Sequence, residues 1–595
     1  MASCLENLDD DESAIQVDLS NAFNNVKRAA FLPLVREHFP HLYNLVGFLY
    51  SSKGRLIAGA HVIKSCEGVQ QGDPLGPFLF SLVLHVLIRK IEKEFPNLKL
   101  NLWYLDDGSL VGKNDELVDV LNLISTFGSE LGLNLNLNKC VAYSKPGTPN
   151  NLPLTVQKVS DGLIVLGSPI GSQPFVSNSI KCVIDNIAGT MMKCRKLDNP
   201  QEELLLLRNC TGAPKLIYWL RNSNPSLIAQ DILAFDKLVD DSLKHIIGQP
   251  LTWEERTLAH LPLSMGGLGI PIAAWIAPAA FVSSIGSSWN LQNVSTPRSG
   301  FDFFKNYLTS LGVSVPVLPP KNCLVSPLNH LKSGYSQANL MLDLNKLRLS
   351  ELQLNLPKRT QVLITGQSCK AANYWITACP NTFSRTTLTP AVFRMLLKYH
   401  LGIPILSYPQ PCPDCHKLMD VYGDHAMVCP VSSNRIDKHD SIAELLFENL
   451  KKAGLSVCLN VGKPEQHDGS RPGDIYLSKF DNLGESYFDI SIINILCPSH
   501  LARASKGQLQ GSDIRYKEKL KKYSDLKDQL KPLIIENTGG WHPKSFETLK
   551  SLSELIAHRT NQSTKDVLNS LLLNISVNLQ RDQGAMVVRR CQGLA

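Results

Sequence analysis

Several features that define common protein classes are missing from this chain of 595 residues. It has no signal peptide at Met1, and none of its apolar runs is long and uninterrupted enough to span a membrane. The least charged stretch, 266–286, is interrupted by Pro271 and Pro278 and is typical of a buried helix or loop. A sustained internal repeat and a long low-complexity segment are also absent. We therefore expect an intracellular protein without a membrane segment.

Charge is scarce as well, at 19% of residues, while hydrophobic residues make up 44%. This balance excludes global disorder, and the length allows several domains with their own cores. The net charge of +7 is compatible with nucleic acid but does not demonstrate binding. The 15 cysteines are scattered, which is typical of reduced thiols inside cells, except in one cluster described below.

Two adjacent carboxylates, Asp106 and Asp107, stand inside the apolar run 101–112. The Asp107-Gly108 step between two such runs predicts a β-hairpin. Two like charges at a hairpin tip repel each other, and a divalent metal ion is the usual partner that stabilises them. On this segment alone a plain Asp-Gly turn is the simpler interpretation.

Two further segments change that judgement. In the first, a short β-type run ends at Asp18 and a helical pattern follows as far as Phe39. Asp18 or Ser20 as a helix N-cap is the alternative interpretation there. In the second, 68–77, a Gly/Pro-rich segment opens an amphipathic helix expected over 78–95. A turn with proline in the first helical turn would explain this segment too, but the three segments together, in this order, are not expected by chance.

This order resembles the palm of reverse transcriptases, most closely those of retrotransposons without long terminal repeats. Asp18 matches the first catalytic aspartate of the family, Gln71-Gly72-Asp73-Pro74-Leu75-Gly76-Pro77 its Gln-Gly-x-Pro motif, and Tyr104-Leu105-Asp106-Asp107 its Tyr-x-Asp-Asp hairpin. The segment 132–140 is similar to the following motif, which ends in a lysine, and 166–171 to the primer-grip turn. The resemblance covers roughly the first 290 residues, and the set of five motifs is highly specific.

The resemblance implies an RNA-directed DNA polymerase that uses two metal ions, Mg²⁺ or Mn²⁺, held by Asp18, Asp106 and Asp107. Its partners would be an RNA template, a DNA primer and deoxynucleoside triphosphates. The residues implied in substrate binding and catalysis beyond the acids are Phe23 as a gate against the ribose 2′-hydroxyl, Gln71, Gly72 and Tyr104 in substrate binding, and Lys139 near the pyrophosphate. Phe23 as a core aromatic and Lys139 as a solvated lysine are the alternative interpretations.

The second chemical cluster is Cys412-Pro-Asp-Cys415, followed by His425 and Cys429. Four soft ligands in this order predict a tetrahedral structural Zn²⁺ site. The alternative is that the cysteines pack as small hydrophobic residues without a metal.

The segment after this cluster resembles the restriction-like endonuclease of site-specific retrotransposons without long terminal repeats. It contains Arg435 to His439, a helix, Glu465, Arg471-Pro472-Gly473-Asp474, and a β-type run through Asp489. The resemblance implies that Asp474 and Asp489 hold a metal ion for cleavage of a DNA target. The residue two past Asp489 is Ser491 rather than the usual lysine, so the lysine is expected from the following helix, where Lys519 and Lys522 are candidates. For either lysine taken alone, a solvated helix face is the stronger interpretation.

We therefore predict an α+β multidomain fold: a reverse-transcriptase palm made of an antiparallel sheet plus helices, a helical thumb, a zinc site and an α/β restriction-like endonuclease domain. The predicted boundaries are 1–172 for the palm, 173–290 for the thumb, 291–405 for a partly helical connector, 406–435 for the zinc site, 436–531 for the endonuclease and 532–595 for a C-terminal helical tail.

Only a short acidic leader precedes Asp18, whereas the family has a fingers subdomain upstream. We therefore expect a truncated product, a decayed copy or a gene model that begins late, with weak or absent polymerase activity. The main hypothesis is a polymerase that primes synthesis from target DNA nicked by the same chain, in the nucleus. A nucleic-acid-binding relic without catalysis, and a nuclease with an inert palm, are the alternatives.

Overall fold

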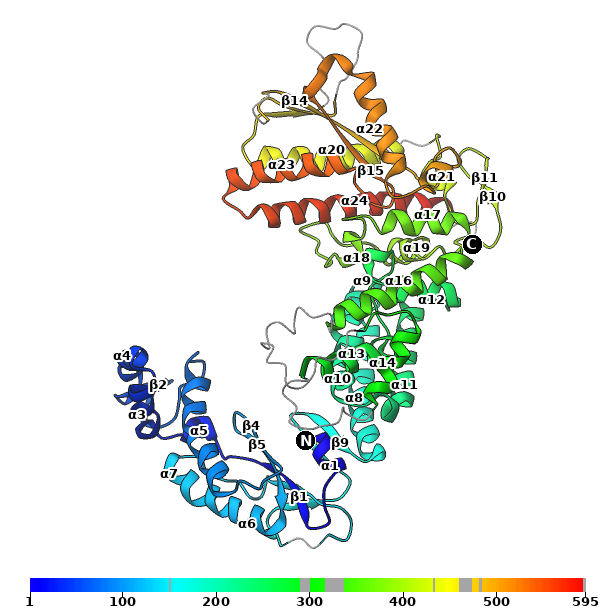
Figure 1. The fold of residues 1–595 in the computed structure, drawn as a ribbon. Coiled ribbons are helices and arrows are strands. Elements are labelled where there is room, and N and C mark those ends of the chain that lie inside the picture. Colours follow the sequence, from blue (N-terminus) through cyan, green and yellow to red (C-terminus); the bar gives the residue numbers. More distant parts are fainter. Residues whose placement is uncertain are drawn as a thin grey trace.

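The structure is a computed structural model of the chain. It describes residues 1–148, 151–288, 300–315, 336–431, 434–459, 473–480 and 484–591. The chain forms three successive lobes, which we call the N-terminal lobe (1–171), the middle lobe (172–405) and the C-terminal lobe (434–591). Figure 1 shows the N-terminal lobe in blue, joined through the helices of the middle lobe to the C-terminal lobe in orange and red.

A five-stranded sheet forms the centre of the N-terminal lobe. Its strands lie in the order β4-β5-β1-β6-β7, so that the first strand of the chain is central. β1 is antiparallel to both of its neighbours, because it pairs Val17 with Gly108 on one side and Ile15 with Ala142 on the other. The strands are β1 (Glu12–Val17), β4 (Leu100–Tyr104), β5 (Asp107–Lys113), β6 (Val141–Tyr143) and β7 (Gln157–Val159).

Helices surround this sheet and share its apolar core. The core includes buried side chains from β1, from α3 and from the long helix α5, such as Ile15, Phe31 and Phe80. Two hairpins complete the lobe, β2 (Gly54–Ala58) with β3 (His61–Ser65), and β8 (Gly162–Val165) with β9 (Ser168–Gly171). The helices are α1 (Ala2–Glu6), α2 (Ala22–Asn25), α3 (Arg28–His38), α4 (Pro40–Tyr50), α5 (Gly76–Glu94), α6 (Asn114–Leu123) and α7 (Ser129–Leu131).

The helix predicted over 78–95 is confirmed within two residues by α5, but the continuous helix predicted after Asp18 is wrong. The chain breaks between α2 and α3, where Val26 and Lys27 leave the helical conformation. Neither Asp18 nor Ser20 is an N-cap, since Asn21 precedes α2. Asp18 is therefore not used to cap a helix, and its side chain remains available for another role.

The middle lobe consists of helices, and none of the described helices in any lobe is long and apolar enough to cross a membrane. The segment 202–220 is not one continuous helix, because a π-helical turn (Leu207–Thr211) and Gly212 interrupt it before Pro214. The described helices of this lobe are α8 (Gln173–Arg195), α9 (Pro200–Leu206), α10 (Ile217–Asn222), α11 (Ala229–Ile247), α12 (Trp253–His260), α13 (Ala273–Ser288), α14 (Phe301–Ser310), α16 (Gln337–Asn355), α17 (Lys358–Gln367), α18 (Tyr374–Thr377) and α19 (Pro390–His400). The weakly charged stretch 266–286 is largely the buried helix α13, as its sequence predicted.

The predicted connector is part of a hydrophobic core and does not merely link two separate domains. Residues 291–299 and 316–335 of the connector lie outside the described residues, but α16 to α19 pack into the same apolar cluster as α8 to α13. That cluster also contains Cys412 and Cys429. The middle lobe and the cysteine cluster are therefore parts of one packed unit.

A mixed four-stranded sheet, β12-β13-β14-β15, is the centre of the C-terminal lobe. β14 (Ser486–Ile493), the predicted β-type run through Asp489, is parallel to β15 (Leu530–Glu536) and antiparallel to β13 (Ile475–Leu477). β13 pairs in turn with β12 (Val457–Leu459). The predicted boundary at residue 531 is wrong, because it falls inside β15. The helices are α20 (Asn434–Lys452), α21 (Pro498–Ala504), α22 (Gln510–Lys522), α23 (Pro543–Thr560) and α24 (Thr564–Cys591).

The predicted C-terminal tail is also wrong, because its helices belong to this lobe. α23 and α24 pack against α20 and the sheet, and Leu549 and Ile575 are fully buried in their shared core. Figure 1 shows both helices lying along one face of the lobe. The apolar strand β15 and the two helices that follow it are therefore part of this domain.

Candidate functional sites

Three carboxylates leave the N-terminal sheet at one edge. The β1–β5 ladder ends with the pair Val17 and Gly108, so the next residues, Asp18 and Asp107, emerge side by side. Asp106 occupies the turn between β4 and β5. The backbone of Asp18 is fixed from the other side, because its carbonyl accepts from Asn136 N–H at 2.9 Å. The sheet register therefore brings together three acids that lie almost ninety residues apart in the sequence.

The turn of this hairpin lies one step earlier than predicted. Tyr104 pairs directly with Asp107, so the two turn residues are Leu105 and Asp106, and Gly108 lies within β5. Leu105 has φ 55°, a left-handed conformation that costs a branched residue about 1–2 kcal/mol. Gly108 is needed for space, since a Cβ there would lie 2.6 Å from the Trp103 ring. Backbone strain of this kind is typical of functional sites.

The electrostatics of the three acids fit a bound cation. Burial raises the pKa of Asp107, and the charges of Asp106 and Asp18 raise it further. Oδ2 of Asp18 is buried and has no hydrogen-bond partner among the described residues. A buried carboxylate oxygen without a partner is costly, and a divalent cation would satisfy it. The donor set, three carboxylates at one open edge, is the type that Mg²⁺ prefers.

The other residues predicted for this site lie around the acids. Phe23 stacks on the buried ring of Phe80, with ring centroids 4.4 Å apart, so both interpretations of Phe23 remain compatible with its position. Gln71 and Gly72 are exposed in the turn that precedes α5, and Lys139 is exposed in the segment that contacts the Asp18 backbone. Tyr104 is 65% exposed and lines a cavity of about 230 Å³ with Asp107 and Leu166.

Asp73, inside the Gln-Gly motif, has a structural role that sequence reasoning missed. Its carboxylate accepts from the Tyr50 hydroxyl and from Leu75 N–H, the latter at 2.9 Å. The Tyr50 hydroxyl also accepts from Gln70 N–H at 3.1 Å. Burial, together with the Asp73 hydrogen bond, raises the pKa of Tyr50 to about 12. Asp73 thus fixes the loop that carries Gln71 and Gly72 against α4.

The four residues of the predicted zinc site converge. One potential ligand atom from each of Cys412, Cys415, His425 and Cys429 lies within 4.8 Å of all the others. Sγ of Cys415 lies 3.1 Å from Nε2 of His425, and the thiols of Cys412 and Cys429 are 3.8 Å apart. Burial alone would raise the pKa of Cys412, but backbone N–H groups of the Cys415 loop and the neighbouring thiols lower it. We call 406–431, which carries these residues, the Cys/His module.

Two arginines, one partly exposed and one fully buried, brace the Cys/His module. Arg359 forms two hydrogen bonds with Asp424, at 2.5 and 2.7 Å. Arg590, in α24, is fully buried; it pairs with Asp414 at 2.8 Å and donates to the carbonyl of Ala426 at 3.1 Å. Asp414 lies between the two cysteines of the Cys-Pro-Asp-Cys turn, so α24 is tied directly to the potential metal ligands.

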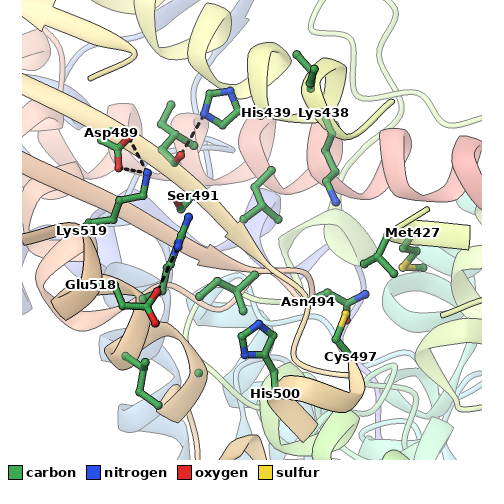
Figure 2. Close-up of a pocket in the computed structure, with 18 of the residues that line it drawn as sticks. Met427, Lys438, His439, Asp489, Ser491, Asn494, Cys497, His500, Glu518 and Lys519 are labelled. Carbon is green, nitrogen blue, oxygen red and sulfur yellow. Dashed lines mark hydrogen bonds and ion pairs between the residues drawn. The ribbon is translucent and has the colours of Figure 1, made fainter. Parts of the chain in front are cut away.

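A second acidic site lies in a cavity of about 780 Å³ in the C-terminal lobe, drawn in Figure 2. Asp474 directly precedes β13, and Asp489 lies on the paired strand β14. The two segments are joined by hydrogen bonds, because Asp474 N–H donates to the carbonyl of Phe488 and the Asp474 carboxylate accepts from Ile490 N–H at 2.7 Å. Nζ of Lys519 lies 2.7 Å from Asp489 Oδ2. Burial raises the pKa of Asp489, and Lys519 opposes that change. Two acids and one lysine from separate elements therefore share this cavity.

Of the two candidate lysines, the structure brings only Lys519 to the acids. Lys522 is exposed and its ammonium lies 4.8 Å from the centre of the Tyr523 ring, outside the cavity. Sequence reasoning did not single out His439, whose Nε2–H donates to Asp474 at 3.1 Å. This hydrogen bond raises the pKa of His439 to about 9. Its position near the start of α20 gave no signal of this contact. Glu465, Arg471 and Pro472 lie outside the described residues.

Comparison with known proteins identifies the N-terminal lobe. Residues 1–170 match the family described as reverse transcriptase (RNA-dependent DNA polymerase). The Retrotransposable element SLACS 132 kDa protein of Trypanosoma brucei gambiense is 26% identical over 277 residues, 45% of this chain and 23% of that protein. The Pol polyprotein of the R2 element of Popillia japonica is 27% identical over 298 residues, 44% of this chain and 40% of that protein.

Another relative is the Pol polyprotein of the R2DM element of Drosophila melanogaster, 26% identical over 44% of this chain and 27% of that protein. The matches thus cover less than half the length of each of these curated relatives. A solved telomerase from Candida albicans in complex with telomeric RNA covers 50% of this chain and 46% of its own, at 11% identity and a TM-score of 0.27. A likeness this low carries no argument about the fold.

Proposed function

We propose that this chain, which carries the reverse transcriptase domain of a LINE-like retrotransposon, is an RNA-directed DNA polymerase. The observation that carries the proposal is the convergence of Asp18 and Asp107 at one sheet edge, beside Asp106 in a strained turn. Three acids at an open edge favour catalysis over passive binding, because their mutual repulsion is a cost that a binding surface has no need to bear.

Mg²⁺ or Mn²⁺ would be held by Asp18, Asp106 and Asp107, and would supply Lewis-acid stabilisation of the charge that develops during nucleotidyl transfer. Phe23, on its buried support Phe80, would form the wall beside the sugar of a deoxynucleoside triphosphate. Gln71, Gly72 and Tyr104 would contact the template, the nucleotide and the primer, and Lys139 would face the pyrophosphate. The helices α8 to α11 would contact the RNA–DNA duplex as a thumb.

The proposal is tested by primer extension on an RNA template. We expect the purified chain to add deoxynucleotides at a low rate in the presence of Mg²⁺, as its sequence predicts, and to stop when the ion is chelated. The same assay with ribonucleotides measures sugar selection, which should favour deoxynucleotides. Extension that is equally fast with chelator present would contradict a metal-dependent polymerase and would indicate a contaminating activity.

A second candidate function is DNA cleavage in the C-terminal lobe, supported by Lys519 lying 2.7 Å from Asp489 in the same cavity as Asp474. Two acids and a lysine are the groups needed to hold a metal ion and to stabilise charge on a scissile phosphate. Cleavage of a DNA target would expose a 3′-hydroxyl that primes synthesis at the N-terminal lobe. Such a protein would act on genomic DNA, and therefore in the nucleus.

Nicking of a supercoiled plasmid tests this function. We expect Lys519→Ala to lower the nicking rate about 10²-fold or more, because it removes the cation beside Asp489. Lys522→Ala is the matched control: it lies one turn along the same helix and should keep the wild-type rate. Equal nicking by the wild type, Lys519→Ala and Asp489→Ala would remove the endonuclease proposal.

The four potential ligands in the Cys/His module are proposed to hold a structural Zn²⁺ ion.

A further inference from the structure

The cavity of the C-terminal lobe extends well beyond its acids. Asp489 and Lys519 occupy one end, while the other end lies between the Cys/His module and the end of β14 (Figure 2). Asn494 and His500 lie at this second end, which we call the distal end. A volume of about 780 Å³ is more than two acids, a lysine and a metal ion require. The distal end therefore has room for a further part of a substrate.

Asn494 presents a fixed hydrogen-bond donor at the distal end. Its Oδ1 accepts from Leu496 N–H at 3.0 Å, which sets the orientation of the amide. Its Nδ2 is covered by neighbouring atoms and has no hydrogen-bond partner among the described residues. A buried N–H group without a hydrogen-bond partner destabilises the empty site. A ligand acceptor that displaces the atoms over Nδ2 would accept its hydrogen bond.

Apolar side chains also line the cavity. They include Val428 and Pro430 of the Cys/His module and Ile436 at the start of α20, whose side chain is 63% exposed. An isoleucine in a cavity lining gives a flat or apolar part of a ligand a surface to pack against. A nucleobase offers both features that this end requires, an apolar face for these side chains and a polar edge for Asn494.

We propose that the distal end is a subsite for one base of the DNA strand that is cut, with Asn494 Nδ2 donating to an acceptor on the edge of that base. The inference rests on the proposed endonuclease and adds a sequence preference to it. Asn494 follows Asp489 by five residues, which is about 16 Å along a strand. A stacked DNA strand advances about 3.4 Å per nucleotide, so the base lies within about five nucleotides of the cut.

The test maps the positions of nicks. Plasmid DNA is nicked by the wild type, the ends are sequenced, and base frequencies are tabulated at each offset from the cut. At one offset within about five nucleotides of the cut, we expect the frequency of one base, or of two related bases, to be about three- to tenfold above the others. This is the effect of a single hydrogen bond. Asn494→Asp keeps the acceptor that Leu496 N–H needs but replaces the donor, and should erase or invert the preference at that offset.

Asn199→Asp is the matched control, because Asn199 also accepts from backbone N–H groups but lies in the middle lobe. It should keep the wild-type profile. An unchanged profile in Asn494→Asp, or no preferred offset in the wild type, would overturn the subsite. If neither the wild type nor any variant nicks DNA, the endonuclease proposal fails, and the affinities for homopolymer oligonucleotides then test the subsite by itself. A base preference of the wild type that is lost in Asn494→Asp supports the subsite. Equal affinities for all homopolymers overturn it.

Discussion

Asp18→Asn should lower the rate of primer extension about 10²–10³-fold or more while raising the melting temperature of the metal-free protein at neutral pH. The rate falls because Asn keeps the shape of the side chain but removes the charge that holds the metal ion. Stability rises because Asp18 raises the pKa of Asp107, together with burial and Asp106. Primer extension and thermal unfolding, each with and without Mg²⁺, measure the two effects.

The sign of the stability effect follows from proton linkage. A carboxyl whose pKa is raised on folding binds its proton more tightly in the folded state, so stability is lost as pH rises above the unfolded value. Asp18→Asn removes one source of this loss, and Mg²⁺ should stabilise the wild type more than the variant. Asp119→Asn, an exposed change on α6, is the control and should alter neither quantity. A variant that extends primers at the wild-type rate would show that Asp18 holds no catalytic metal.

The candidate acids of both sites were singled out by a resemblance to known families, while local signals predicted the strands around them. The apolar runs around Asp106 and Asp489 predicted strands, and the Cys-x-x-Cys spacing predicted a cluster that the structure brings within 4.8 Å. What local signals could not supply was the sheet register. The turn was placed at Asp107-Gly108 because that step favours hairpins, whereas pairing of Tyr104 with Asp107 and the bulk of Trp103 against Gly108 place it one residue earlier.

Contacts between distant segments were equally inaccessible from the sequence. Lys519 and Lys522 lie one turn apart on the same helix, so the sequence does not distinguish them. The packing of α22 against β15 determines that Lys519 reaches Asp489. His439 contacts Asp474 across 35 residues, and no local pattern marks that pair. The C-terminal helices were taken for a tail because amphipathic helices can pack against any apolar surface, and the sequence does not say which one.

Arg590→Met should lower the free energy of unfolding by about 3–5 kcal/mol and accelerate the loss of zinc from the Cys/His module. Arg590 is fully buried and pairs with Asp414 at 2.8 Å, inside the Cys-Pro-Asp-Cys turn. Methionine fills the space but leaves Asp414 and the carbonyl of Ala426 without their buried partner. Denaturant unfolding measures the stability, and transfer of zinc to a chromophoric chelator measures the metal.

Arg589→Met is a closely matched control, because Arg589 is the preceding residue and bonds the same carboxylate at 3.0 Å. Its side chain is 55% exposed, so its ion pair is screened by water and should contribute at most about 1 kcal/mol. Burial alone would raise the pKa of Asp414, but the two arginines lower it below its ordinary value. The stabilisation that the arginines provide is therefore present at neutral pH and is lost on acidification. Equal destabilisation by the two variants would show that burial of Arg590 does not determine the strength of the pair, and wild-type zinc retention in Arg590→Met would show that α24 does not support the metal ligands.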